Sequence, residues 1–202
     1  MAGRKRSFDR DIALDKAMRV FWNNGYAATS VSNLTSELGI NTPSLYAAFG
    51  NKEQLFKEVV AHYIKQYSEP CYRHITEPSD ANFIERLRAC FYELIQKFSD
   101  ANTPLGCLLV KSVNESDSVA FPEEATVYIK QFGLKTKKML TTLIESEGVI
   151  TESATAELQA KYLLSVVYGI STQVRAGESQ QVAESIMDYA LNTIPTRSES
   201  VA

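Results

Sequence analysis

The chain has 202 residues, of which 45% are hydrophobic and 22% are charged, and its formal net charge is −3. This composition is typical of one globular domain of ordinary size or two small ones, and it excludes a disordered chain. No stretch approaches the about 18 consecutive apolar residues that a membrane span needs, so we expect no membrane partner.

Charge is distributed unevenly along the sequence. Residues 1–65 hold nine Lys and Arg against six Asp and Glu, whereas residues 66–202 hold twelve against eighteen. Arg4, Lys5 and Arg6 begin the basic part. A basic end on an acidic body suggests a local contact with a polyanion, but an arbitrarily charged tail explains the pattern equally well.

The cellular compartment is indicated by the N-terminus and the cysteines. The basic N-terminus has no apolar segment behind it, so no secretory signal is visible. Cys71, Cys90 and Cys107 are odd in number and far apart. This spacing argues against a disulfide framework and for a reducing compartment, so we expect a cytoplasmic protein.

Apolar residues recur with helical spacing through nearly the whole chain, and no sustained strand alternation occurs. A first helix is predicted from about Ser7, as its N-cap, to Asn24, where Gly25 suits the left-handed position after a helix. A second helix is predicted from Thr29-Ser30 to Leu38.

A third helix, over residues 43–49, is too short and too weakly amphipathic to build a core by itself. Thr42 is predicted as its N-cap and Pro43 as its first residue, because a residue before proline disfavours the α conformation. Leu45 and Phe49 can pack inward. The hydroxyl-bearing side would then remain outside.

Six further helices are predicted after this short one. Two prolines in residues 68–82 mark the expected boundary between an N-terminal and a C-terminal part. The predicted ranges are 51–67, 83–98, 107–113, 121–144, 152–176 and 179–191. We therefore expect an all-α fold of about nine helices.

Residues 30–49 fit a helix-turn-helix, with Gly39-Ile40-Asn41 as the turn. In such a unit the second helix enters the major groove, where hydroxyls meet base edges and methyl groups meet thymine. Helix N-termini and Lys52 would lie near phosphates. An ordinary helical hairpin with a structural glycine turn is the alternative.

Two sequence pieces, ALDKAMRVFWNNGYAATSV and LTSELGINTPSLYAAFGNKEQLF, settle this choice. Residues 13–56 resemble the DNA-binding domain of the TetR family of bacterial transcriptional regulators. The matching positions are Phe21, Gly25, Tyr26, Thr29, Ser30, Val31, Gly39, Ile40, Leu45, Tyr46, Phe49, Lys52, Glu53 and Leu55.

The resemblance implies two domains. Residues 1–50 would form the DNA-binding domain, with its helix-turn-helix at about 30–49 and a connecting helix at 51–67. Residues 68–202 would bind an effector and form a homodimer. The implied function is a ligand-responsive regulator, most simply a repressor, which binds a palindromic operator on double-stranded DNA and is released by a small molecule.

The resemblance also assigns roles to single residues. The recognition helix would include Thr42, Pro43, Ser44, Tyr46 and Ala47. Tyr46 and Lys52 would contact phosphates, and Thr29 and Ser30 would buttress or touch the DNA backbone. The basic arm of Arg4, Lys5 and Arg6 would reach along a groove, or would equally be a loose tail.

The recognition helix departs from the family in one respect. Many relatives have Lys or Arg near position 42 and His after the tyrosine, whereas this chain has Thr42 and Ala47. Because no Arg, Asn or Gln on the helix can contact a base through two hydrogen bonds, we expect readout by methyl contacts and DNA shape.

Self-association is predicted from the helix at 152–176, which is apolar nearly all round between Leu158 and Ile170. The next helix, at 179–191, carries a further apolar stripe, and one small helical domain is not expected to cover both helices, although a core helix in a monomer is the weaker alternative. The family resemblance implies the same dimer. The dimer would place two recognition helices about 34–36 Å apart, as a palindromic operator requires. The predicted interface residues are Leu158, Val167, Gly169, Ile170, Val182, Ile186 and Tyr189.

An effector pocket is implied by the resemblance, inside the C-terminal helices. The candidate lining residues are Phe91, Leu94, Cys107, Tyr128, Phe132, Tyr162 and Val166. Each of them is also compatible with an ordinary core position.

Cys107 admits a second function. It stands at a predicted helix start, where the helix dipole can lower a thiol pKa, so a redox or electrophile sensor is the alternative to an inert buried cysteine. Cys71 and His74 are too few to hold zinc, and we expect them in a surface loop without metal or cofactor. An enzyme is the least supported class, because no catalytic constellation can be assembled.

Overall fold

The computed structural model describes residues 8–147 and 153–194. The predicted arm of Arg4, Lys5 and Arg6 and the predicted cap Ser7 lie outside the described residues. Within the described ranges every regular element is a helix, which confirms the all-α prediction.

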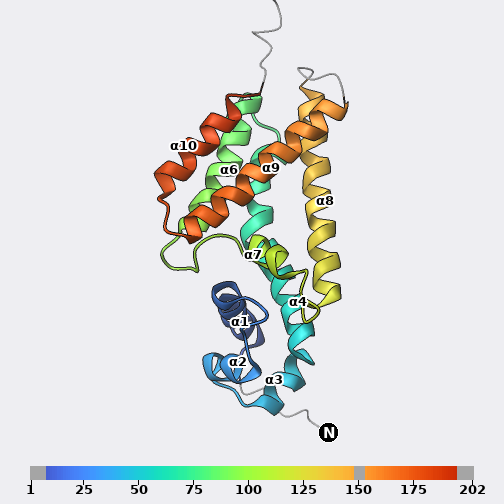
Figure 1. Ribbon diagram of the computed structural model, residues 1–202, viewed down its shortest axis with the longest axis vertical. Coiled ribbons are helices and arrows are strands. Elements are labelled where there is room, and N and C mark those ends of the chain that lie inside the picture. The colour runs from blue at the N-terminus through green and yellow to red at the C-terminus, as the bar shows by residue number, and fades with distance from the viewer. Residues whose placement is uncertain (1–7, 148–152, 195–202) are drawn as a thin grey trace, which may run out of the picture.

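The helices form two groups that α4 connects (Figure 1). Ten α-helices are present in the described part of the chain, one more than predicted, because a short α5 occupies part of the expected boundary. Their bounds are α1 Arg10–Asn24, α2 Val31–Leu38, α3 Thr42–Phe49, α4 Lys52–Tyr63, α5 Arg73–Thr76, α6 Phe83–Ser99, α7 Leu108–Glu115, α8 Glu123–Ser146, α9 Ser153–Arg175 and α10 Gln180–Leu191.

The limits of α1 are set by its caps. The Asp9 side chain accepts two backbone N–H bonds, so the helix begins at Arg10 rather than just after Ser7. Gly25 follows the helix at φ 86° and donates its N–H to the Phe21 carbonyl at 2.7 Å. The predicted end of this helix is therefore confirmed.

The helical path of α4 continues past the predicted end at residue 67. A π-helical turn, Ile64–Ser68, leads into a 3₁₀ turn, Glu69–Tyr72, and then into α5. Pro70 lies in the first turn of the 3₁₀ segment, where its missing N–H costs no hydrogen bond. The helical run therefore ends at Thr76, and the proline does not break it.

The C-x-x-H pair lies on this helical run and not in a loop. Cys71 is buried and its thiol contacts the Tyr67 carbonyl at 3.2 Å. His74 Nε2 lies 2.8 Å from the Glu93 carboxylate. Cys71 is thus part of the buried core, and His74 links α5 to α6.

An aromatic cluster joins the two groups of helices. Trp22 on α1 is fully buried, with its ring centroid 4.9 Å from Tyr63 and 5.1 Å from Tyr67. Tyr26 and Phe56 pack on Phe121, which precedes α8, at 5.5 and 5.4 Å. One core therefore runs through both groups.

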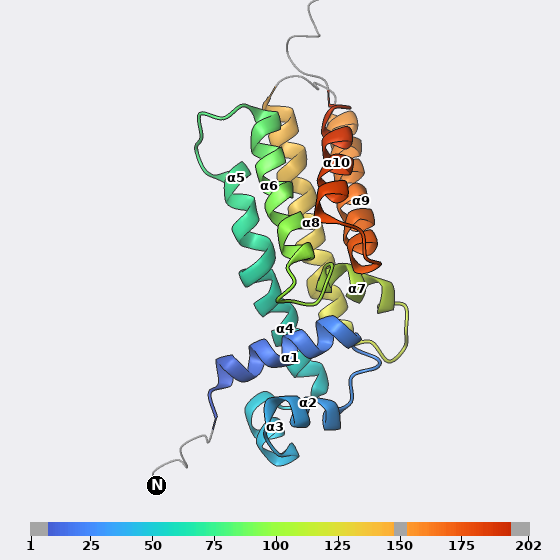
Figure 2. The same cartoon turned by 90° about the vertical axis from the view of Figure 1, so that its left-hand side faces the viewer.

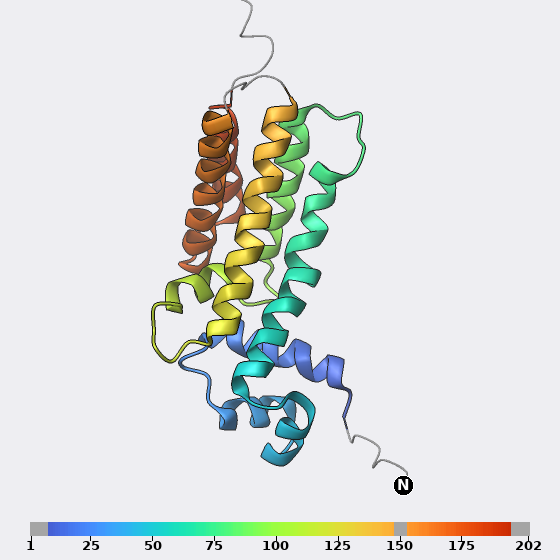
Figure 3. The ribbon, with the colours of Figure 1, turned by 90° about the vertical axis from the view of Figure 1, so that its right-hand side faces the viewer.

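The C-terminal bundle stands on α1 (Figures 2 and 3). Figure 2 shows α1 lying across α4 at the base of the bundle, with α9 and α10 together along one side. Figure 3 shows α4 and α8 side by side on another face. None of the described helices is both long and apolar enough to cross a membrane.

Candidate DNA-binding surface

The turn between α2 and α3 is fixed by local hydrogen bonds. The Ser30 side chain accepts the Asn33 N–H at 3.0 Å, and the Asn33 side chain accepts the Ser30 N–H at 3.0 Å. Gly39 ends α2 in the left-handed conformation, at φ 66°, and the Ile40 N–H returns to the Thr35 carbonyl at 3.1 Å. This closure is typical of a helix end with glycine and sets the direction of α3.

The cap of α3 is one residue earlier than predicted. Asn41 accepts the Ser44 N–H at 2.9 Å, so Thr42 is the first helical residue and Pro43 the second. Both Asn and Thr are good N-caps. The missing N–H of Pro43 falls among the unpaired donors of the first turn in either register, so proline alone does not decide between them.

The two faces of α3 divide as predicted. Leu45 and Phe49 are buried beneath the helix, at 0% and 3% exposure. Figure 1 places α3 at the end of the molecule remote from the C-terminal bundle. The outward residues are Thr42, Pro43, Tyr46 and Ala47, which are exposed, and Ser44, which is half-buried.

Arg10 locks α3 onto the rest of the N-terminal group. Its Nη2 is 2.6 and 2.7 Å from the two Glu58 carboxylate oxygens, and its Nε donates to the Ala48 carbonyl at 3.3 Å. The guanidinium also lies 4.6 Å from the Phe49 ring centroid. The sequence showed Arg10 only as a positive charge, because its partners are far along the chain.

Two residues predicted to contact the DNA backbone, Lys52 and Thr29, interact with other parts of the protein in this conformation. Lys52 Nζ lies 4.0 Å over the Tyr26 ring, and burial lowers the pKa of this amine. Thr29 is 1% exposed and donates its hydroxyl to the Gly25 carbonyl at 2.6 Å. Thr29 is thus placed to buttress, whereas the neighbouring Ser30 is exposed.

Helix α7 holds the turn after α1. The Glu115 carboxylate accepts the N–H groups of Tyr26 and Ala27 at 2.8 and 3.2 Å. Lys111 Nζ donates to the Asn23 carbonyl at 3.1 Å. No sequence pattern indicated this tie, because it joins segments that periodicity treats separately.

A second tie links α1 to α9 through the turn before α7. Trp22 Nε1 donates to the Gly106 carbonyl at 3.1 Å, and Arg175 donates to the Trp22 carbonyl at 3.2 Å. The Cys107 N–H donates to Ser171 Oγ at 2.9 Å. These hydrogen bonds connect α1 both to the turn before α7 and to α9.

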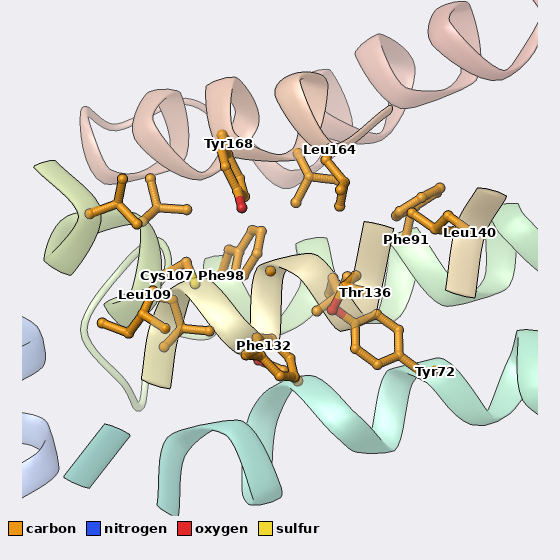
Figure 4. A pocket seen from close by; sticks show the side chains of 17 residues that line it. Tyr72, Phe91, Phe98, Cys107, Leu109, Phe132, Thr136, Leu140, Leu164 and Tyr168 are labelled. Atoms are coloured by element: carbon orange, nitrogen blue, oxygen red, sulfur yellow. The ribbon is translucent and has the colours of Figure 1, made fainter. Parts of the chain in front are cut away.

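A cavity lies within the C-terminal bundle (Figure 4), with about 690 Å³ of empty space counting its open mouth. Its lining comes from the α4–α5 run, α6, α7, α8 and α9. The predicted residues on its wall are Phe91, Leu94, Cys107 and Phe132. The predicted residues that are not on its wall are Tyr128, Tyr162 and Val166.

Cys107 occupies the N-cap position of α7, as predicted, but its thiol is not activated there. Burial raises the pKa of the Cys107 thiol, and this outweighs the lowering by the Leu109 and Val110 N–H groups. The Tyr63 hydroxyl lies 3.4 Å from the sulfur. The expected effect of the helix dipole is thus present but smaller than the desolvation.

The predicted interface residues divide between the surface and the interior. Leu158, Val182 and Tyr189 are exposed on α9 and α10, at 67%, 42% and 76%. Val167 and Ile170 are instead buried inside the subunit, so their predicted place at the interface is wrong. A helix that is apolar on all sides hides which residues face its own bundle. Of the remaining two, Gly169 is exposed and Ile186 is half-buried.

Comparison with known proteins agrees with this geometry. Residues 13–59 match the family model described as "Bacterial regulatory proteins, tetR family". The chain is 29% identical over 202 residues to the HTH-type transcriptional repressor ComR of Escherichia coli strain K12, covering 95% of this chain and 90% of ComR. It is 31% identical over 169 residues to the HTH-type transcriptional regulator LmrA of Bacillus subtilis strain 168, covering 73% of this chain and 87% of LmrA.

A solved structure extends the similarity to the whole fold. It contains a cysteine mutant of the TetR family transcriptional regulator CifR complexed with 26bp double-strand operator DNA. The TM-score is 0.81 and the identity 29%, with 95% of this chain and 100% of that chain covered. On its sequence, its helix-turn-helix and its overall fold, the chain belongs to the TetR family of bacterial regulatory proteins.

Proposed function

We propose that the protein is a ligand-responsive transcriptional repressor that acts in the cytoplasm as a homodimer on a palindromic operator. The observation that carries the proposal is the arrangement of α3, which is anchored by Leu45 and Phe49 and exposes its other face. The relatives support it, because ComR is a transcriptional repressor and CifR was solved with operator DNA.

The proposed DNA contacts follow from the exposed face of α3. Thr42, Pro43, Ser44 and Ala47 would lie against base edges, and the Tyr46 hydroxyl would donate to a phosphate. Because these side chains offer hydroxyls and methyl groups only, sequence would be read by thymine methyl contacts and by DNA shape.

The start of α4 supplies further phosphate contacts in this proposal. Asn51 caps the helix by accepting the Gln54 N–H at 2.8 Å, and the remaining N–H groups of the first turn are available to an anion. Lys52 would leave the Tyr26 ring and turn toward the same phosphate, whose negative charge would compensate the ammonium group for the hydration that its present position removes.

The proposed dimer is built from α9 and α10. Leu158 and Tyr189 expose large apolar surfaces on two adjacent helices, and such a patch on one subunit is typical of a protein interface. Two-fold symmetry brings the same pair from the partner against it, which forms a four-helix contact. Two α3 helices then face one side of the duplex.

The proposed effector site is the cavity in the C-terminal bundle. Ser68 and Tyr72 on its wall belong to the π and 3₁₀ turns that continue α4, and Leu109 and Val110 on its wall belong to α7. A ligand that fits better when α4 is tilted would change the spacing of the two α3 helices. It shifts this equilibrium only by its difference in affinity for the two arrangements.

In this proposal residues 1–50 act as the DNA-binding domain and residues 68–202 as the effector and dimerisation domain. The connecting segment transmits the signal between them, together with α7, whose Glu115 holds the turn after α1.

A thiol-switched repressor is the weaker alternative. Cys107 lies on the cavity wall, but burial favours its neutral, unreactive form. Treatment of the folded protein with iodoacetamide at pH 7.5 should therefore leave operator binding unchanged over an hour. Rapid alkylation of Cys107 with loss of operator binding would favour the switch.

A salt titration of DNA binding tests the proposed function. Fluorescence anisotropy would measure the Kd for a duplex taken from the DNA upstream of the coding region, between about 50 and 300 mM KCl. The proposal predicts that log Kd rises linearly with log salt, with a slope of several units, because phosphate contacts release counterions. Absence of binding at the lowest salt concentration would contradict it.

A further inference from the structure

The cavity has a lining that is polar in places but carries no charge among its described residues. Its polar side chains are Ser68, Tyr72, Cys107, Thr136 and Tyr168. Burial raises the pKa of Tyr72 and Cys107, and partial desolvation raises that of Tyr168, which is still 42% exposed, so all three are neutral at physiological pH. A ligand in this space meets only neutral groups.

Three of these polar groups already have partners inside the protein. The Thr136 side chain lies close enough to the Tyr72 hydroxyl to lower the pKa of that phenol, and the Cys107 sulfur accepts a hydrogen bond from the Tyr63 hydroxyl at 3.4 Å. The remaining wall is formed mainly by aromatic and aliphatic side chains from α6 to α9.

Tyr168 differs from these groups. Its hydroxyl points into the cavity from α9 (Figure 4), and no described residue forms a hydrogen bond with it. It lies 4.0 Å from the position that a Cβ atom would take on Gly133, which faces it from α8. The absence of a side chain at Gly133 therefore keeps the space in front of this hydroxyl open.

A partly buried charge near the cavity, Arg175, is engaged by another part of the protein. Arg175 is partly buried near Cys107, but it is not on the cavity wall and it donates to the Trp22 carbonyl at 3.2 Å. Its side chain also packs beside Gly106, where a Cβ atom would lie 3.2 Å from Arg175 Cβ. An anionic ligand in the cavity would thus lack a counter-charge on the wall.

We propose that the effector is an uncharged, mainly aromatic or aliphatic molecule with one hydrogen-bonding group that meets the Tyr168 hydroxyl opposite Gly133. The proposal rests on the proposed function, since it identifies the chemical class that the effector site accepts. An ionised ligand would lose its hydration on entry without gaining a charged partner, which strongly disfavours it. An apolar one gains burial of its surface.

Two fluorescent probes that share one skeleton test the selection by charge. N-phenyl-1-naphthylamine is neutral, and 1-anilinonaphthalene-8-sulfonate adds a sulfonate to the same rings. The full-length protein would be titrated with each, and the emission increase gives the Kd. We expect saturable binding of the neutral probe at one site per subunit, and binding of the anionic probe at least about tenfold weaker, because the sulfonate would be buried unpaired.

Variants at Gly133 show whether the probe occupies this cavity. Gly133→Leu would place a side chain toward the Tyr168 hydroxyl and should abolish binding of the neutral probe. Gly133→Ala is the matched control, because its methyl group has ordinary van der Waals contact at 4.0 Å, so binding should be retained. Tyr168→Phe should weaken binding of the neutral probe about fivefold through loss of one hydrogen bond.

Operator binding by each variant separates the two proposals. If the wild type bound both probes with equal affinity and Gly133→Leu bound neither, the cavity would accept anions, and the proposal of a neutral effector would be overturned. Operator binding by Gly133→Leu shows that this variant is still folded. Unchanged neutral-probe binding in Gly133→Leu would overturn the cavity as the site. Failure of the wild-type protein to bind the operator contradicts the proposed function instead, whichever probe binds.

Discussion

The Glu115 carboxylate on α7 accepts the backbone N–H of Tyr26, which follows the Gly25 turn at the end of α1, at 2.8 Å. An acidic side chain of the C-terminal part therefore completes the hydrogen bonding of the DNA-binding part. The carboxylate packs closely against Gly25, because a Cβ atom at this position would overlap it.

Removal of the Glu115 carboxylate should weaken the contact between α7 and the turn after α1. Glu115→Ala leaves the N–H groups of Tyr26 and Ala27 without their acceptor, and we expect a loss of about 1 kcal/mol in the free energy of unfolding, since the site is only half-buried. Urea denaturation measures it. Asn114→Ala, at the exposed neighbouring position, is the control and should change stability little. Equal stability of both variants would show that the tie has no energetic role.

Substitutions on α3 should separate affinity from specificity. Tyr46→Ala should weaken binding to every duplex about tenfold, because it would remove the proposed phosphate contact. Tyr46→Phe should weaken binding less, because it removes only the hydroxyl. Ser44→Ala should mainly change the ratio of operator to scrambled DNA affinity. Competition anisotropy measures both. Since Tyr46 is 44% exposed, its variants should have the same urea midpoint of unfolding as the wild type. Unchanged DNA affinity in these variants would refute the assignment of α3 as the recognition helix.

Charged substitutions on α9 and α10 should dissociate the proposed dimer. Leu158→Glu combined with Tyr189→Glu places charges in the centre of the proposed contact, where they would lose hydration on burial. Light scattering should give twice 22.5 kDa for the wild type and 22.5 kDa for the double variant. Ile12→Glu, at an apolar position on α1 that is 59% exposed, should remain dimeric. A monomeric wild type would contradict the interface.

Acid should weaken the contact between α8 and α9 through one carboxylate. Lys137 and Lys161 donate to Glu157 at 2.8 and 2.9 Å and lower its pKa from 4.5 to about 2. Because the folded pKa lies below the unfolded one, this contribution is complete above pH 4.5 and is lost as the pH falls toward 2.

Glu157→Gln removes the titrating group while keeping the shape of the side chain. Its stability should therefore fall less than that of the wild type between pH 4.5 and 2, as thermal unfolding at low salt would show. The difference should shrink in 1 M NaCl, since the group is exposed and the pairs are screened. Parallel stability curves for the two proteins would contradict the assigned pKa.

Local patterns in the sequence were sufficient for most of the helices. The glycines that end α1 and α2 require a positive φ, and both have it, at 86° and 66°. The buried pair on α3 follows helical spacing. By contrast, the prolines in residues 68–82 suggested a break, but Pro70 occupies a position where proline fits a new helical turn.

Contacts between distant segments were not accessible from periodicity. Lys52 stands at a helix start, where a phosphate contact is expected, yet the neighbouring α1–α2 turn brings the Tyr26 ring beneath it. Val167 and Ile170 lie close to Tyr168 on α9. Only the packing of α9 on its own bundle shows that Val167 and Ile170 are buried inside the subunit. The tie from Glu115 is likewise a product of the tertiary fold.

A hydroxyl-radical footprint on the DNA upstream of the coding region tests the central claim most directly, namely that two outward α3 helices bind one operator. The wild type should protect two symmetric patches whose centres are about 10 bp apart, one turn of the duplex. Ala47→Glu, at an exposed position on α3, should abolish both. A single patch, or the same footprint from the Ala47→Glu protein, would contradict the account.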